Sequence, residues 1–159
     1  MKTRLKNELI RDWVDSLNVE CNASIENYND VLNRLINGQD PGPITIHIID
    51  YEYNKLINAT FVFSDTYPFK PPEVMINNTY NYKRLIGTIN TSLVKKTLGL
   101  ECLCCSSILC KWGASFCLTS IVNEISRNLN LKLRSSSINV GHLFTMNVFG
   151  HYLPIEEFL

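Results

Sequence analysis

A proline-rich segment constrains the fold of this chain more than any other feature. Three prolines, Pro68, Pro71 and Pro72, fall within five residues. Each proline ring fixes φ and removes an N–H donor, so the segment cannot form the interior of a helix. Residues that precede a proline are held in extended conformations. Because apolar runs lie on both sides, at 59–63 and 74–76, we predict a rigid extended connector between two β-strands.

The residues before and after this connector predict an α+β fold. Apolar residues spaced by three and four positions predict an N-terminal helix over 5–17. Strands are predicted at 44–51, 56–63 and 73–77, within a four-stranded antiparallel meander. Residues 18–42 contain a turn cluster at their end but give no clear assignment.

The second half of the chain is predicted to be mainly helical. A short helix is predicted over 92–98, with Gly99 as its C-terminal cap. A longer amphipathic helix is predicted to begin at Ser115, which can act as its N-cap. The serines at 135–137 predict a loop, and we treat residues 131–159 as a divergent C-terminal tail.

Size and composition predict one domain over residues 1–159. The net charge is zero and no Lys/Arg block is present, so neither nucleic acid nor a membrane surface is an expected partner. The N-terminal segment lacks the apolar core of a signal peptide, and we therefore expect a cytoplasmic or nuclear protein. In such a compartment the six cysteines predict thiols, metal ligands or a nucleophile rather than disulfides.

A cysteine cluster is the main candidate for chemistry. Cys102, Cys104, Cys105 and Cys110 fall within nine positions. Core packing is one interpretation, but neighbouring residues alternate faces in an extended chain and cannot all be buried. A zinc site is a second interpretation, but only Cys102 and Cys105 form a Cys-x2-Cys pair, so we assign no metal. The third is an exposed nucleophilic thiolate.

The order of these segments resembles that of ubiquitin-conjugating enzymes. In that family a strand-flanked Tyr-Pro-Phe-Lys-Pro-Pro connector, present here at 67–72, precedes a catalytic cysteine in a Gly-x-x-Cys-Leu context. This chain has Gly99-Leu-Glu-Cys102-Leu, then Trp112, then the helix predicted from Ser115. The repeated cysteines are most similar to divergent members encoded by giant DNA viruses.

The resemblance implies an enzyme that accepts ubiquitin, or a ubiquitin-like modifier, as a cysteine thioester and passes it to a lysine or a ligase. The implied partners are the modifier, an activating enzyme and a ubiquitin ligase, and no cofactor is implied. Cys102 is the preferred nucleophile because of its upstream glycine and following leucine. Cys105, which heads a Cys-x-x-Ile-Leu segment, and Cys104 are the alternatives.

The chain departs from the family at the Ser-Pro that usually follows the tryptophan, where it has Gly113-Ala114, and at a motif before the nucleophile. The family carries His-Pro-Asn shortly before the nucleophile, and its Asn donates a hydrogen bond to the oxyanion of the tetrahedral intermediate. No His-Pro-Asn occurs here. The resemblance leaves Asn90 as the oxyanion donor, with Asn78 and Asn81 as further candidates.

The resemblance also implies a ligase-binding surface made of Phe69, Gly113 and Ala114 together with the first helix. Tyr67 and Trp112 are instead expected to pack in the core. Two other functions stay open from the sequence. The missing His-Pro-Asn favours a non-catalytic variant that binds ubiquitin or a partner, and the cysteine cluster favours a small zinc-binding interaction domain.

Overall fold

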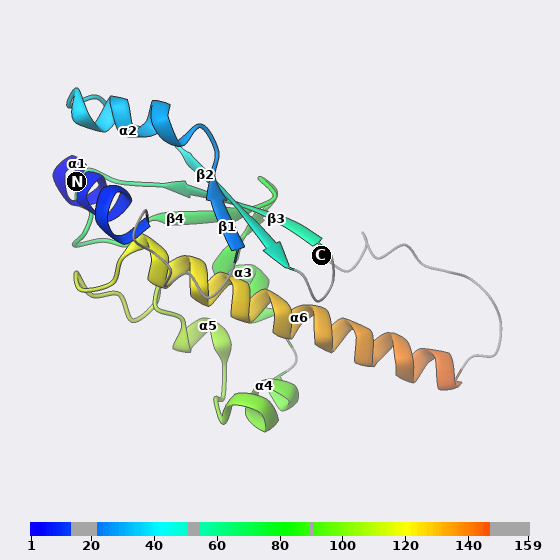
Figure 1. The fold of residues 1–159 in the computed structure, drawn as a ribbon. Coiled ribbons are helices and arrows are strands. Elements are labelled where there is room, and N and C mark those ends of the chain that lie inside the picture. The colour runs from blue at the N-terminus through cyan, green and yellow to red at the C-terminus, as the bar shows by residue number, and fades with distance from the viewer. Residues whose placement is uncertain (14–21, 51–54, 90, 147–159) are drawn as a thin grey trace.

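The structure is a computed structural model that describes residues 1–13, 22–50, 55–89 and 91–146. It has an antiparallel sheet and several helices, which confirms the expected α+β class (Figure 1). The elements are α1 Lys2–Asn7, the π-helix η1 Glu8–Trp13, β1 Asn22–Ile25, α2 Tyr28–Ile36, β2 Ile44–Asp50, β3 Lys55–Val62, β4 Glu73–Ile76, β5 Tyr80–Asn81, α3 Tyr82–Gly87, α4 Thr91–Leu98, α5 Leu103–Ser106 and α6 Leu118–Met146.

The sheet is a meander in which each strand pairs with the next one along the chain, in the order β1-β2-β3-β4-β5. Among the described residues it has five strands rather than the predicted four. The last strand has only two residues, and the first lies in the segment left unassigned from the sequence, where its only buried residue is Ile25. Such short strands carry too few apolar positions for alternation to reveal them.

One face of the sheet builds the core. The pairs Ile46–Ala59 and Phe61–Val74 lie opposite each other on neighbouring strands and are fully or almost fully buried. Alternate residues point to the other face of a strand. On that face Thr45 and Thr60 are paired and their hydroxyl oxygens are 3.3 Å apart.

The connector joins β3 to β4 as predicted, but it is not extended throughout. The Tyr67 amide donates to the Ser64 carbonyl at 3.0 Å, and the Phe69 amide donates to Thr66 at 2.8 Å. Residues 65–69 are therefore turns, and only Pro71 and Pro72 lead directly into β4. Proline fixes its own φ and biases the residue before it, which leaves residues 64–66 free to turn.

The first helix differs from the prediction in form. A single α-helix was expected over 5–17, whereas α1 continues as the π-helix η1, and residues 14–21 lie outside the described part of the chain. Leu5 and Leu9 are buried as predicted, but Ile10 is 42% exposed. Glu8, which the apolar pattern did not single out, is buried at 3% exposure.

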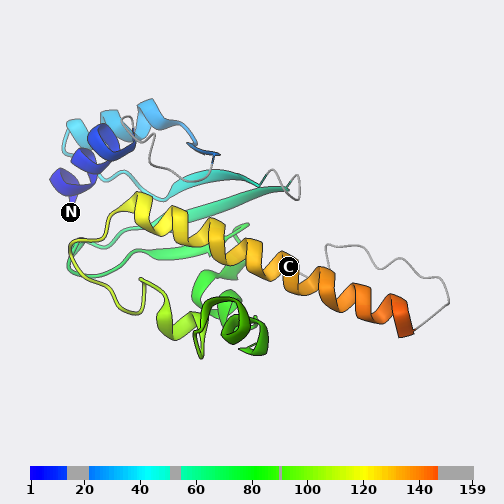
Figure 2. The ribbon, with the colours of Figure 1, turned by 60° about the horizontal axis from the view of Figure 1, so that its bottom comes forward.

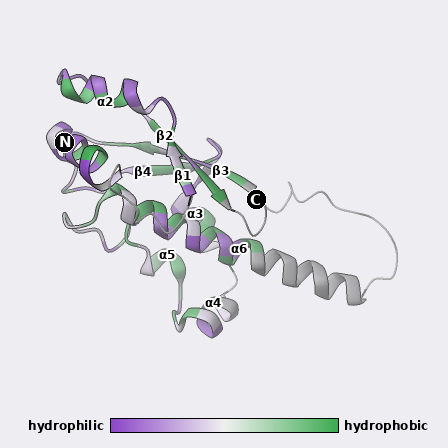
Figure 3. Cartoon of the chain, in the orientation of Figure 1, coloured by the Kyte–Doolittle hydropathy of each residue, from purple (hydrophilic) through white to green (hydrophobic). Residues whose placement is uncertain are grey.

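Helix α2, between β1 and β2, was not predicted. Its buried residues are Val31 and Leu35, one turn apart, and the other side of the helix is polar (Figure 3). Two buried positions give only a weak periodic signal. The helix follows Asn27, which has a φ of +51° and makes no side-chain cap hydrogen bond, so the usual N-cap signal is also missing.

Helix α6 carries the buried face predicted for it but has different bounds. It begins at Leu118 rather than Ser115, and Phe116 is only half-buried. The loop predicted at 135–137 is wrong, because α6 runs through these residues to Met146. Serine has an ordinary helix propensity and does not by itself end a helix. Figures 1 and 2 show α6 crossing the sheet, and in Figure 2 the green helices between β5 and α6 in the sequence lie together below α6.

Candidate active site

The cysteine cluster follows α4 and begins at Cys102, just before α5, which contains Cys104 and Cys105. Helix α4 and its Gly99 cap are confirmed, since the helix ends at Leu98 and Gly99 has a φ of +67°. Lys95 and Glu101 form an ion pair of 2.7 Å across this turn. The chain then extends at Cys102, with φ −153° and ψ 133°, and enters α5. Cys102 therefore occupies the position that precedes the first helical residue.

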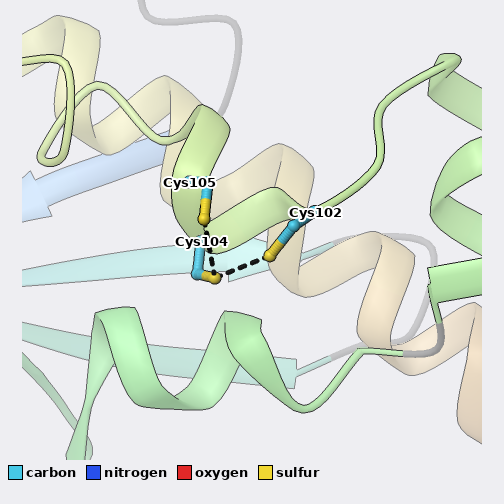
Figure 4. Close-up of side chains that lie close together, drawn as sticks. All are labelled: Cys102, Cys104 and Cys105. Atoms are coloured by element: carbon cyan, nitrogen blue, oxygen red, sulfur yellow. Dashed lines mark hydrogen bonds between the residues drawn. The ribbon is translucent and has the colours of Figure 1, made fainter.

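Three thiols converge at this point. The sulfur of Cys104 is 2.6 Å from that of Cys102 and 3.8 Å from that of Cys105, and it lies between the two (Figure 4). Cys105 is exposed, while Cys102 and Cys104 are partly buried. Part of the surroundings comes from α3, because a side chain at Gly87 would contact the Cβ and Sγ atoms of Cys104 at 3.8 and 3.9 Å.

The three thiols differ in acidity. Cys102 and Cys104 share a hydrogen bond in which either sulfur can be the donor, and this bond, with those of the Cys105 and Cys104 backbone amides, lowers the pKa of Cys102 to about 7. The same bond raises the pKa of Cys104 to about 11. Cys102 is therefore about half ionised at neutral pH, while Cys104 stays protonated. The arrangement therefore favours the thiolate form at Cys102 over the thiolate form at Cys104.

A buried carboxylate holds the segment that follows the cysteines. Glu124 of α6 accepts hydrogen bonds from the Ser107 hydroxyl at 2.6 Å and from the Ile108 amide at 2.7 Å. It also accepts from the Tyr82 hydroxyl of α3 at 3.1 Å. Sequence reasoning missed this residue. A glutamate next to Ile125 and three positions after Ile121, on the apolar stripe of the helix, was the available signal.

A second buried carboxylate ties the connector to the helices. Glu8 accepts from the Tyr67 hydroxyl and, at 3.0 Å, from the Leu118 amide at the start of α6. Arg4 of α1 pairs with the same carboxylate at 2.6 Å. Tyr67 is 1% exposed, which confirms its expected core position. Glu8 therefore fixes the connector, α6 and α1 relative to one another.

Trp112 joins the connector to the loop after the cysteines. Its indole Nε1–H donates to the Pro68 carbonyl at 2.7 Å, and its ring centroid is 6.0 Å from that of Tyr67. Trp112 is partly buried against the core, as expected. The bond links the residue before Phe69 to the residue before Gly113. Phe69 is 82% exposed beside Pro68, and Gly113 and Ala114 follow Trp112 directly.

Of the three proposed oxyanion donors, the structure describes two. Asn90 lies outside the described residues. Asn81 is the N-cap of α3, where its side-chain oxygen accepts from the Arg84 amide at 3.3 Å. The side-chain oxygen of Asn78 accepts from the Thr60 hydroxyl at 2.8 Å on the outer face of the sheet. Asn78 and Asn81 are thus engaged in turns at the sheet edge.

Three of the clustered cysteines also form the group of possible metal ligands found in the described part of the chain. One ligand atom from each of Cys102, Cys104 and Cys105 lies within 4.8 Å of the other two. Cys110, the fourth cysteine of the sequence cluster, is exposed and is not part of this group. The arrangement offers three thiol ligands rather than the four of a structural zinc site.

A surface hollow in the described part of the chain is separate from the three clustered cysteines. A surface hollow of about 480 Å³ lies between β4, β5 and α3, with Met75, Arg84 and Lys132 among its walls. None of the three clustered cysteines borders it. A thiol on an open surface is accessible to a large reactant, such as the end of a protein chain, without a pocket to enclose it.

Comparisons with protein-family models, with curated proteins and with solved structures gave no match for this chain. Among the described residues, no helix combines the length and apolar character needed to cross a membrane.

Proposed function

We propose that the protein is a ubiquitin-conjugating enzyme that carries ubiquitin, or a ubiquitin-like modifier, as a thioester on Cys102. The observation that carries this proposal is the state of the Cys102 thiol. It is accessible, it shares a hydrogen bond with Cys104, and its pKa is lowered to about 7. A nucleophilic cysteine needs these properties, whereas a cysteine that only fills the core does not.

The order of the elements also supports the proposal. An N-terminal helix, an antiparallel meander, the connector at 67–72, the cysteine segment, Trp112 and α6 follow one another as in the family that the sequence resembles. Helix α2, inserted between β1 and β2, is additional to that scheme. The ubiquitin-conjugating fold is thus part of the proposal.

The reaction uses the two protonation states of the cysteine pair. The Cys102 thiolate attacks the carbonyl carbon of the modifier's thioester on the activating enzyme, and a new C–S bond forms as the old one breaks. The thiolate of the activating enzyme leaves. A lysine amine or a ligase thiolate then attacks the Cys102 thioester, and Cys102 leaves as a thiolate. A sulfur of lowered pKa is the better leaving group, so the Cys104 hydrogen bond favours this second step.

The Cys104 thiol has a positioning role in this scheme. Its raised pKa keeps it protonated as the donor to Cys102. Cys105 remains the alternative nucleophile, because it is exposed and its spacing to Ile108 and Leu109 also fits the family pattern. Cys104 is the weakest of the three candidates, since a thiol with a pKa of about 11 is almost fully protonated at neutral pH.

The proposed ligase-binding surface comprises Phe69, Gly113 and Ala114. An aromatic side chain that is 82% exposed is costly to leave in water, and aromatic residues are frequent hot spots of interfaces. The Trp112–Pro68 hydrogen bond holds the two loops together, so that one partner can contact both of them.

A thioester assay tests the function. The protein is incubated with activating enzyme, ubiquitin and ATP in the presence of a chelator, and is resolved with and without reductant. We expect a reducible adduct in the unchanged protein, in Cys105→Ala and in the matched control Cys110→Ala, and no adduct in Cys102→Ala. Loss of the adduct in Cys105→Ala alone would transfer the nucleophile to that residue. No adduct with ubiquitin or with ubiquitin-like modifiers, from folded protein, would favour the non-catalytic binding variant.

A further inference from the structure

We propose that Cys102, Cys104 and Cys105 bind one Zn²⁺ ion as three thiolate ligands, and that the bound ion blocks the nucleophile. The sequence alone argued against a metal, because a second Cys-x2-Cys pair is missing. The convergence of the three sulfurs, all within 4.8 Å of one another, points to a site instead. The blocking effect rests on the function proposed above, whereas metal binding itself does not.

The sulfur separations are close to those that a zinc ion requires. Zn–S bonds of about 2.3 Å in a tetrahedron place two sulfurs about 3.8 Å apart. The Cys104–Cys105 separation is 3.8 Å. The Cys102–Cys104 separation is 2.6 Å and must increase by about 1 Å. Cys102 is partly exposed and precedes α5, so its sulfur has room to move away from Cys104.

The local chain favours this convergence. Cys104 and Cys105 belong to the short helix α5, and Cys102 precedes its first residue. Leu103 and Leu109, on either side of the pair, are 3% and 4% exposed and hold the segment in the core. Apolar packing of Leu103 and Leu109 therefore helps to hold the three sulfurs close together.

Three ligands leave one coordination position open. Structural zinc sites are closed by four protein ligands, whereas sites with three keep a position for water or another molecule. In the described part of the chain, the group of close ligand atoms has no fourth member. The site is therefore expected to bind zinc reversibly and to contribute little to folding, in contrast to a zinc-binding interaction domain.

Occupation of the site stops the proposed reaction. Each thiol that binds loses its proton and directs a lone pair to the metal, and no electron transfer is involved. The Cys102 sulfur in a Zn–S bond cannot attack a thioester. Zinc is thus an inhibitor of the proposed thioester formation, and a chelator that removes it restores the free thiolate.

The test is a zinc titration of the reduced, metal-free 159-residue chain against a chromophoric chelator, followed by a Co²⁺ titration to detect thiolate coordination in the absorption spectrum. We expect one ion per chain. Replacing a second-shell partner of a metal site typically weakens binding by about 10–100-fold, so removal of a direct ligand in Cys102→Ser, Cys104→Ser or Cys105→Ser is expected to weaken it by at least about tenfold. Cys110→Ser and Cys117→Ser, which change cysteines outside the group of three proposed ligands, keep the original affinity.

The outcomes test the zinc site and the proposed conjugating function separately. Circular dichroism of each variant shows whether it has folded. Folded Cys102→Ser, Cys104→Ser and Cys105→Ser proteins that bind zinc as tightly as the unchanged chain, or an unchanged chain that binds none, overturn the site. A thioester assay with and without zinc then tests the blocking effect. An adduct that forms equally in zinc-loaded protein overturns that effect, while the absence of any adduct without zinc counts against the proposed function and leaves the titration result standing.

Discussion

The phenol oxygen of Tyr67 lies 2.9 and 2.7 Å from the two carboxylate oxygens of Glu8, a residue 59 positions earlier in the chain. Both side chains are buried, at 1% and 3% exposure. A buried carboxylate needs donors to replace the water that it has lost. The tyrosine of the proline connector is thus an internal donor for an acid of the first helices.

Tyr67→Phe tests this relationship. The change removes the donor but keeps the ring, and it leaves Glu8 with the Leu118 amide and Arg4 as its partners. We expect a loss of stability of about 1–3 kcal/mol, because a buried polar group loses a hydrogen bond. Urea denaturation measures the change. Tyr80→Phe, at a tyrosine that is 40% exposed, is the matched control and should leave the denaturation midpoint almost unchanged.

The buried tyrosines also predict a loss of stability in alkali. Burial, followed by the nearby Glu8 charge, raises the pKa of Tyr67 above its usual value, and burial with Glu124 does the same for Tyr82. The folded protein therefore retains both phenol protons above about pH 10, where an unfolded chain loses them. Stability is full below that pH and falls as the pH rises further. Melting temperatures between pH 8 and 11 should fall less steeply in Tyr67→Phe. Equal slopes in the two proteins would contradict the prediction.

The acidity of Cys102 predicts selective alkylation. In chelator-treated protein its rate of reaction with iodoacetamide should rise with a midpoint near its pKa of about 7. Cys104→Ala removes the main hydrogen bond to this sulfur, so the midpoint should move toward the usual thiol pKa of about 8.5. The rate at pH 7 should then fall about tenfold, since only a few per cent of an ordinary thiol is ionised there. Peptide mass spectrometry follows the modification at each cysteine, and Cys110→Ala is expected to leave the Cys102 profile as it is.

Glu124→Gln tests the anchor of the cysteine segment. The substitution preserves the shape of the side chain but replaces one of its two acceptor oxygens with an NH₂ group, so that the Ser107 hydroxyl or the Ile108 amide loses its acceptor. We expect a loss of about 1–3 kcal/mol in stability and faster hydrogen exchange of the Ile108 amide. Glu101→Gln is the control, because that side chain is 83% exposed and its surface ion pair contributes little. An unchanged exchange rate in Glu124→Gln would show that other contacts hold the segment.

Phe69→Ala tests the proposed ligase-binding surface separately from the proposed thioester formation. The side chain is 82% exposed, so its removal should not alter the denaturation midpoint or the formation of the thioester. Release of the modifier from the Cys102 thioester, when stimulated by a ligase, should be lost if the ligase binds the proposed surface. Leu56→Ala, which removes another exposed apolar side chain, is the control. A ligase that acts equally on Phe69→Ala would exclude this surface for that ligase.

The features that the sequence predicts well are those with strong local signals. Alternating apolar residues predict β2 and β3 almost to their observed ends, and Gly99 marks the end of α4 because few other residues adopt its positive φ. The apolar face of α6 follows from a sustained helical period. Each of these signals lies within one element.

The features that the sequence does not predict depend on contacts between distant segments. Glu8 and Glu124 each occur in an apolar helical pattern, where a single acid looks like an interruption, and only their partners in the fold explain their burial. The convergence of Cys102 and Cys105 on Cys104 depends on the angle at which the chain enters α5. The predicted loop at 135–137 fails for another reason, since serines alone do not end a helix.

The two buried acids have a consequence for protein engineering. Glu8 accepts a hydrogen bond from the first amide of α6, and Glu124 lies less than two turns further along the same helix. The connector and the cysteine segment are therefore both held against α6, at two nearby points. A graft of residues 99–112 onto another scaffold leaves both acids behind. Such a graft is expected to preserve the spacing of the cysteines but to lose their arrangement, unless a carboxylate is supplied to receive the Ser107 hydroxyl and the Ile108 amide.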